Sequence, residues 1–410
     1  MFSRILRTAP SGGSSAWASL ADRALATQQC RAFSQSQALA SSVIHFPKTS
    51  STELDNLLEN VRYKVILPSY LPEGQRKRLY NRHYKAQLEA DPITMEIDGE
   101  KLRFYFTDPV RDVPSTKKSL YDIIDLMKTP DDWAILPRLL EGLCVQAGRK
   151  LHYNQYGKLI RRAAMAGCIH TILTCAREVK RTNFKLDNQE IALDVMVNIQ
   201  VEAILSDWDA AETAKALQRT ERVLDMLEEK DHQPTTKKKA DDTTPKRTYP
   251  LHKDPLILGS RLHMAAAVAA KHNGGVDADG KVAKYAREIV ALWPEGKGAL
   301  ALYGEEDFAA DPSLQHLRHD TQITYTVAPL LHGFRLAADV VEDQELAGQL
   351  RTRAEVLERE LSTAIERKPM APGRRVERVY RKLFPDQNPP VAAEEAAASK
   401  HPVEAQTVEA

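Results

Sequence analysis

The spacing of apolar residues divides the chain into a short mixed segment and a long helical one. Two runs of β-forming residues, 93–97 and 102–106, flank Asp98-Gly99, a dipeptide typical of a tight hairpin turn. From residue 115 onward the apolar positions recur with the helical period, and such segments continue to about residue 383. The pattern predicts an all-α protein, built as an array of helical hairpins, with a small N-terminal β-hairpin.

Breaks in this pattern predict the domain organisation. The stretch around Lys237–Lys239 combines charge with three prolines, which is typical of a mobile loop. The last residues are rich in Ala, Glu and Pro, which predicts a disordered tail. The predicted segments are a presequence at 1–40, an N-terminal extension at 41–114 with the hairpin at 93–106, a helical repeat region at 115–230, the loop at 231–254, a C-terminal helical region at 255–384 and the tail at 385–410.

The first fifty residues have the composition of a mitochondrial import signal. They carry five basic residues against a single acid, Asp22, among many Ser and Ala residues. Residues 31–34, Arg-Ala-Phe-Ser, resemble the site cut by the matrix processing peptidase, and residues 33–40 resemble the octapeptide removed in a second step. We therefore predict import into the mitochondrial matrix and a mature protein that begins near Ser34 or Ser41. The alternative is a disordered Ser/Ala-rich terminus.

Composition limits what the mature part can do. Without the five basic and one acidic residues of 1–50, the chain's 57 basic and 56 acidic residues leave a net charge of −3. A free-standing, nonspecific nucleic-acid binder needs a broadly positive surface, so any RNA contact must come from segregated basic patches. Beyond residue 50 the cysteines are Cys144, Cys168 and Cys175, and we predict that they are packed and reduced.

The first of three basic clusters lies between residues 62 and 85. Its cations alternate with four tyrosines, and Glu73 is the lone acid of the stretch. Guanidinium groups pair with phosphates and aromatic faces accept unstacked bases, so this composition suits RNA. A solvated helix over 74–89 accounts for it equally well. The candidate RNA-binding residues of the first cluster are Arg76, Lys77, Arg78, Arg82 and Lys85.

The second and third clusters lie further along the chain. The second, at 149–185, has nine basic residues and one acid, an uncompensated excess that favours phosphate binding over mere solubility. The third surrounds the Pro-x-x-Pro-Gly break at 369–373. Between them, 186–231 has twelve acids against four bases and suits a protein neighbour. The candidate RNA-binding residues are Arg149, Lys150, Lys158, Arg161 and Arg162 in the second cluster, and Arg374, Arg375 and Arg378 in the third.

The segment from Tyr153 to Asn188 resembles a pentatricopeptide-type helical hairpin. It opens with Tyr-Asn, carries Leu-Ile in a first helix, bends at Ala166-Gly167 and ends a second helix with apolar-x-apolar-Asp. Each helix has an apolar stripe that would be buried against the other helix and its neighbours. The resemblance implies a helical-repeat fold of the pentatricopeptide or tetratricopeptide kind over about 100 residues.

Taken together, the import signal, the basic and aromatic lead-in, the helical repeat and the charged tail make the chain similar to the fungal-type accessory proteins of the mitochondrial ribosome. That resemblance implies a structural ribosomal component whose partners are mitochondrial rRNA and ribosomal proteins. Two alternatives remain open, namely a pentatricopeptide-like factor for the maturation or translation of mitochondrial RNA, and an assembly factor for a respiratory complex.

Signals of catalysis are missing from the sequence. There is no Gly-rich phosphate loop after a strand and no Gly-x-Ser-x-Gly elbow. The turn at 277–280 lacks the spacing of a calcium loop, and His316 and His319 lack a nearby third ligand. No apolar run approaches the roughly 20 residues of a membrane span. We expect no enzyme activity, no cofactor, no bound metal, no small-molecule substrate and no transmembrane segment.

Overall fold

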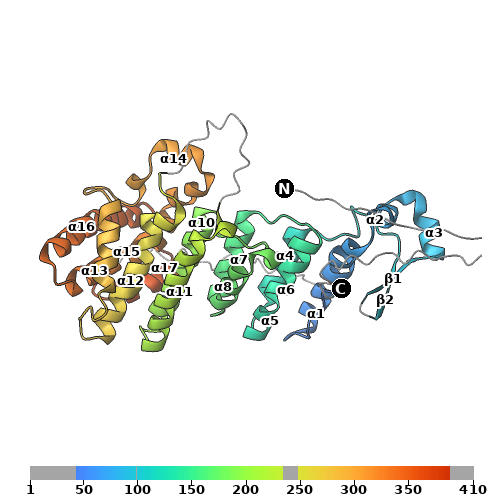
Figure 1. Cartoon of the computed structure of the whole chain (residues 1–410), viewed down its shortest axis with the longest axis horizontal. Coiled ribbons are helices and arrows are strands. Elements are labelled where there is room, and N and C mark those ends of the chain that lie inside the picture. Colours follow the sequence, from blue (N-terminus) through green and yellow to red (C-terminus); the bar gives the residue numbers. More distant parts are fainter. Residues whose placement is uncertain (1–42, 98, 234–247, 388–410) are drawn as a thin grey trace, which may run out of the picture. The chain divides into compact units, whose positions relative to one another are not determined.

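The computed structural model describes residues 43–97, 99–233 and 248–387, and Figure 1 shows their helices joined in chain order. The all-α prediction is confirmed, because this part is mainly helical and the sheet within it is two-stranded. The predicted presequence and most of the predicted loop and tail lie outside the described residues.

Short helices and turns open the described part of the chain. The first helix begins where the Ser51 hydroxyl accepts the backbone N–H of Leu54 at 3.2 Å. The single helix considered over 74–89 is not formed, because Asn81 accepts the N–H of His83 and caps a separate 3₁₀ turn. The helices of this region are α1 (Thr52–Val61), α2 (Glu73–Leu79) and α3 (Lys85–Ala90).

The β-hairpin is confirmed, with one correction. Strands β1 (Ile93–Ile97) and β2 (Glu100–Phe104) are antiparallel. The sequence pattern placed the second strand two residues later, but Gly99 has a φ of 81°, so a two-residue connection closes the turn and the strand begins at once. Leu102 and Phe104 are buried against a small apolar cluster that includes Leu79.

The middle of the chain contains the segment that resembles a pentatricopeptide hairpin. The apolar stripes expected on its two helices are buried, from Tyr156 in the first to Val179 in the second. The second helix is broken at Glu178, and the Thr182 hydroxyl donates to the carbonyl of Cys175 at 2.7 Å. The three cysteines are buried and free, as predicted. The helices are α4 (Thr116–Leu126), α5 (Pro130–Ala134), α6 (Leu136–Leu140), α7 (Tyr153–Met165), α8 (Ile169–Arg177) and α9 (Val179–Thr182).

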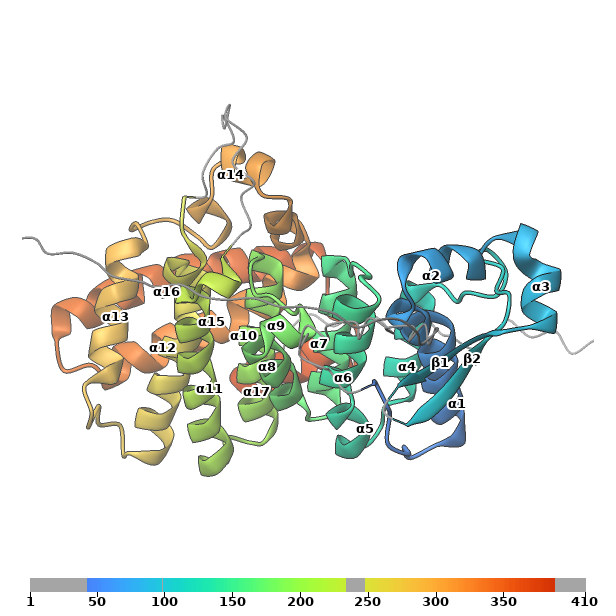
Figure 2. The ribbon, with the colours of Figure 1, turned by 45° about the vertical axis from the view of Figure 1, so that its right-hand side comes forward.

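Longer helices form the C-terminal part, where α10 packs against α7, α11 and α12, and α15 packs against α12 and α16 (Figure 2). At Gly333 a Cβ atom would come within 2.6 Å of the Cβ of His263, so glycine permits the close approach of α15 to α12. The helices are α10 (Gln189–Leu205), α11 (Ala210–Glu228), α12 (Pro255–His272), α13 (Lys281–Leu292), α14 (Glu305–Ala310), α15 (Asp320–Val340), α16 (Gln344–Arg367) and α17 (Arg375–Leu383).

Packed structure extends into the stretch that was predicted to be a mobile loop. The Thr248 hydroxyl donates to the carboxylate of Asp307 at 2.7 Å, and Leu251 is buried. Asp254 accepts the N–H of Leu256 and caps α12, and its carboxylate also accepts the hydroxyl of Tyr303 at 2.8 Å. These hydrogen bonds make residues 248–254 part of the folded helical region.

Candidate nucleic-acid interface

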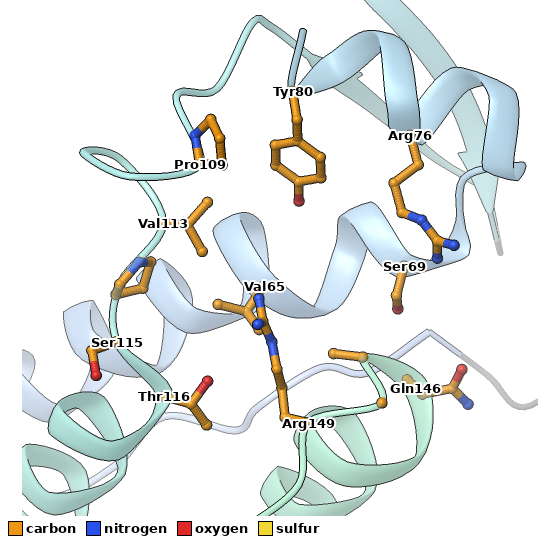
Figure 3. Close-up of a pocket in the computed structure, with 13 residues that line it drawn as sticks. Val65, Ser69, Arg76, Tyr80, Pro109, Val113, Ser115, Thr116, Gln146 and Arg149 are labelled. Atoms are coloured by element: carbon orange, nitrogen blue, oxygen red, sulfur yellow. The ribbon is translucent and has the colours of Figure 1, made fainter.

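The first and second basic clusters meet at one cavity of about 680 Å³. Arg76 reaches it from α2 and Arg149 from the connection that precedes α7. Figure 3 shows the Tyr80 hydroxyl, the Arg76 guanidinium and the Arg149 side chain approaching the cavity from different sides. Other lining residues include Val65, Ser69, Val113, Ser115, Thr116 and Gln146. Residues 73 positions apart in the sequence therefore contribute to one site.

The cavity is electrostatically positive. None of the described residues that line it carries a carboxylate. Within the described ranges, neither Arg76 nor Arg149 makes a side-chain ion pair. Burial raises the pKa of Tyr80, while the positive charges of Arg149 and Arg76 lower it, which shows that both guanidinium groups act on the same hydroxyl.

The other candidate residues of the first cluster already interact with nearby acidic or aromatic side chains. Lys77 pairs with Glu73 at 2.7 Å on the exposed side of α2, and Lys85 lies 3.8 Å from Glu89. The guanidinium of Arg78 lies over the ring of Tyr84, 5.1 Å from its centroid.

Arg82 and Arg62 hold loops of the protein together. Arg82 donates to Asp108 at 3.0 Å. The N–H of Val110 and then Arg82 hold the pKa of Asp108 below its usual value. Arg62 is buried and donates to the Ile44 carbonyl at 2.7 Å and to Glu100 at 2.8 Å. The charge of Arg62 therefore stabilises the folded chain through these contacts.

The second cluster was expected to be uncompensated, and the structure corrects this. Lys158 and Arg162 both pair with Asp125 of α4, at 3.1 and 2.8 Å. Arg161 pairs with Asp194 of α10 at 3.0 Å. These acids lie on other helices, so a count of charges along the segment could not register them. Arg149 and Lys150 have no such partner within the described part of the chain.

The Arg161–Asp194 pair differs from the others because its carboxylate is buried. The side chain of Asp194 is 3% exposed, whereas that of Arg161 is 49% exposed. Burial raises the pKa of Asp194 to about 6, and the nearby positive charge of Arg161 opposes that rise. Arg161 therefore forms an ion pair with a buried carboxylate, and its positive charge stabilises the ionised form of that carboxylate.

The third cluster meets the C-terminal end of α7. Arg375 donates to the carbonyl of Ala164 at 3.4 Å. Arg374 and Arg375 line a cavity of about 530 Å³ together with Met370, while Arg378 is exposed on α17. Lys150 of the second cluster lines another cavity, of about 370 Å³. The sequence-predicted residues therefore lie at several separate places.

Two features of the first cavity escaped the sequence patterns. One is that α4 begins there, with Ser115 and Thr116 in its lining. The Ser115 side chain, at the N-cap position of this helix, makes no capping hydrogen bond. The other is the convergence of Arg76 with Arg149, for which no local signal exists because it depends on how distant segments pack.

The described ranges contain no group of three or more His, Cys, Asp or Glu side chains arranged to hold a metal ion. They also contain no helix with both the length and the apolar character that crossing a membrane requires.

Comparison with known proteins gives the class and the family. A family model described as "Mitochondrial ribosomal protein mS27" matches residues 31–382. The chain is also 35% identical over 338 residues to the small ribosomal subunit protein mS27 of Neurospora crassa, covering 78% of this chain and 84% of that protein. The chain is therefore a mitochondrial ribosomal protein, the class that the resemblance noted in the sequence implied. Within this class it belongs to the mS27 family.

Family membership confirms several expectations drawn from the sequence. The protein is a structural component of the mitochondrial ribosome, it works in the mitochondrial matrix, and its partners are ribosomal RNA and ribosomal proteins. The resemblance to mitochondrial ribosomal accessory proteins is confirmed as well. The pentatricopeptide-type character of 153–188 stays a prediction.

Proposed function

We propose that this protein is a noncatalytic component of the small subunit of the mitochondrial ribosome. The observation that supports the choice of subunit is the match over most of both chains to a relative named as a small-subunit protein. The absence of a phosphate loop or catalytic elbow in the sequence supports a role without chemistry.

In this proposal the basic clusters supply charge-assisted contacts to phosphates of ribosomal RNA. Such contacts fix the position of a protein on RNA without reading its sequence, as a scaffold requires. Arg76, Arg149 and Lys150 are the strongest candidates of the first two clusters, because within the described chain they form neither an ion pair nor a contact over an aromatic ring, in contrast to the other candidates there. Arg374 and Arg378 form a further contact on and beside α17.

The remaining candidates have a smaller part in this proposal. Lys158 and Arg162 share one carboxylate, and Arg161 is held by another. A cation that already has an intramolecular partner must give it up, or share it, to bind a phosphate. The RNA contact of the second cluster is therefore concentrated at its N-terminal end.

Sedimentation of ribosomal subunits tests the proposal. The endogenous protein should sediment with the small subunit in high salt and leave that peak after RNase treatment. Replacement of Arg76, Arg149, Arg374 and Arg378 together by Gln should release the protein at a lower salt concentration, because fewer phosphates are neutralised. A protein that sediments with the large subunit, or with neither subunit, contradicts the proposal.

A further inference from the structure

The cavity between α2 and α4 brings together two arginines from distant segments of the chain, whereas the arginines at the third cluster, Arg374 and Arg375, are neighbours in sequence. Arg76 and Arg149 both line it, and the described residues of its lining include no Asp or Glu. Two guanidinium groups that approach one space repel each other, and an anion between them removes that repulsion. A pair of arginines placed in this way favours the binding of an anion.

Uncharged groups around the cavity can also bind an anion. The Tyr80 hydroxyl points into the cavity in Figure 3, and Thr116 contributes a further hydroxyl group to its lining, whereas the Ser69 hydroxyl donates to the carbonyl of Ile66 at 2.6 Å. Hydroxyl groups donate hydrogen bonds to phosphate oxygens, in addition to the hydrogen bonds that the guanidinium groups donate. The set of donors can serve several oxygens of one tetrahedral group.

The start of α4 adds to the positive potential of the same space. Ser115 precedes this eleven-residue helix and lines the cavity, and no side chain caps the first backbone N–H groups. Free N–H groups and the helix dipole favour negative charge at a helix N-terminus. This end acts together with the two arginines, which come from α2 and from the connection before α7.

We propose that this cavity binds a single phosphate group of an unpaired RNA strand, held by Arg76 and Arg149 together. The inference rests on the proposed contact with ribosomal RNA and assigns one phosphate to two arginines far apart in sequence. An unpaired strand is required because the site is recessed, and a flexible backbone can turn one phosphate inward. The ligand is the backbone phosphodiester, so binding is independent of the base sequence.

A salt titration of variants tests whether the two arginines share one phosphate. The probe is a fluorescein-labelled single-stranded oligouridylate, measured with the full mature chain, with Arg76→Gln, with Arg149→Gln and with the double variant. The logarithm of affinity falls with the logarithm of salt by about 0.7 for each phosphate neutralised on a single strand. One shared phosphate predicts that the double variant loses about 0.7 from this slope in total. A loss of about 1.4 means two separate phosphates, and no loss means no contact; either result overturns the proposal.

A matched control separates a specific loss from a general loss of charge. Lys101→Gln removes one exposed cation from β2, outside the cavity, and should leave the slope nearly unchanged. An equal loss in this control overturns the assignment to the cavity. Thermal unfolding of every variant checks the fold, and the exposed position of Arg149 predicts no change for Arg149→Gln.

Inorganic phosphate distinguishes a backbone phosphate from a free anion. If the site serves RNA, inorganic phosphate should displace the oligonucleotide only in large molar excess over the RNA phosphates. Displacement of the oligonucleotide from the wild type by phosphate equimolar with the RNA phosphates, absent in the double variant, identifies free phosphate as the preferred ligand and overturns the RNA assignment. The sedimentation of the wild-type protein with the small subunit is an independent result, so this inference and the proposed function can fail separately.

Discussion

The two ends of the segment 149–162 carry similar charges and differ completely in their surroundings. At the N-terminal end, Arg149 extends into a cavity whose described lining has no carboxylate. At the other end, Arg161 is paired with the buried Asp194, and Arg162 with Asp125. A run of like charges in the sequence thus has no carboxylate partner at one end and forms ion pairs with neighbouring helices at the other. The difference arises from the helices that pack alongside, not from the residues of the segment itself.

The largest expected effect on stability follows from breaking the ion pair between Arg161 and Asp194. Arg161→Gln should lower the free energy of unfolding by about 2 kcal/mol at pH 7, because it leaves the buried carboxylate of Asp194 without its charged partner. The half-exposed position of Arg161 keeps the cost below that of a fully buried pair. Urea denaturation measures the change. Lys180→Gln, an exposed cation of the same cluster, should cost less than about 0.5 kcal/mol, and equal losses would remove the distinction.

The same pair predicts a pH dependence. The pKa of Asp194 is about 6 in the folded protein and 3.8 in an ordinary environment. Between those values the folded carboxyl binds a proton that the unfolded one does not, so its contribution to stability rises as the pH falls through 6. From pH 7 to pH 5 the gain is about 1 kcal/mol.

Asp194→Asn isolates this contribution. The difference in unfolding free energy between wild type and variant should shift in favour of the wild type as the pH falls from 7 to 5. Urea denaturation at a series of pH values measures it. A difference that stays constant across this range would show that the carboxyl keeps an ordinary pKa.

A substitution of Arg149 should lower the affinity for RNA and leave the free energy of unfolding nearly unchanged. Arg149→Gln should weaken binding of a single-stranded RNA oligonucleotide about fivefold, as the loss of about 1 kcal/mol of charge-assisted contact implies. Its unfolding free energy should stay within about 0.5 kcal/mol of wild type. Fluorescence anisotropy measures the affinity. Arg161→Gln should lower the free energy of unfolding and leave the affinity for RNA nearly unchanged. Equal changes of affinity and stability in the two variants would contradict the distinction between Arg149 and Arg161.

The smallest expected effect concerns the carboxylate shared by Lys158 and Arg162. Asp125→Asn should change the unfolding free energy by less than about 1 kcal/mol, because both pairs are partly exposed. It frees two cations, so affinity for the oligonucleotide should rise up to about twofold. Anisotropy at low salt measures this rise. A fall in affinity would indicate that Asp125 itself orients the cations for RNA.

The elements that sequence predicted best are those with long apolar stripes. The stripes of α7 and α8 are buried as expected, because burial of a helical face depends on a period that the sequence displays directly. The second strand of the hairpin was placed two residues late, and the stretch around residue 80 proved to be a break between helices. Both errors lie at boundaries, where a single turn residue or cap decides the outcome.

The candidate site was predictable only as a list of residues. Composition placed Arg76 and Arg149 in a list of thirteen candidate cations and did not distinguish them from the others. In the structure several of these cations form ion pairs with acids of other helices, whereas Arg76 and Arg149 line the same cavity. The apolar pattern around residue 194 did not reveal that α10 holds a buried carboxylate beside Arg161.

The sequence by itself determined the helical class, the hairpin, the composition of an import signal and the existence of basic clusters. Each of these depends on local composition or periodicity, which is complete within a short stretch of chain. Only the tertiary structure decided which cations stay available for RNA. Electrostatic compensation acts through distances of a few ångströms in space, and residues that close are often more than thirty positions apart in the chain, as Arg161 and Asp194 are.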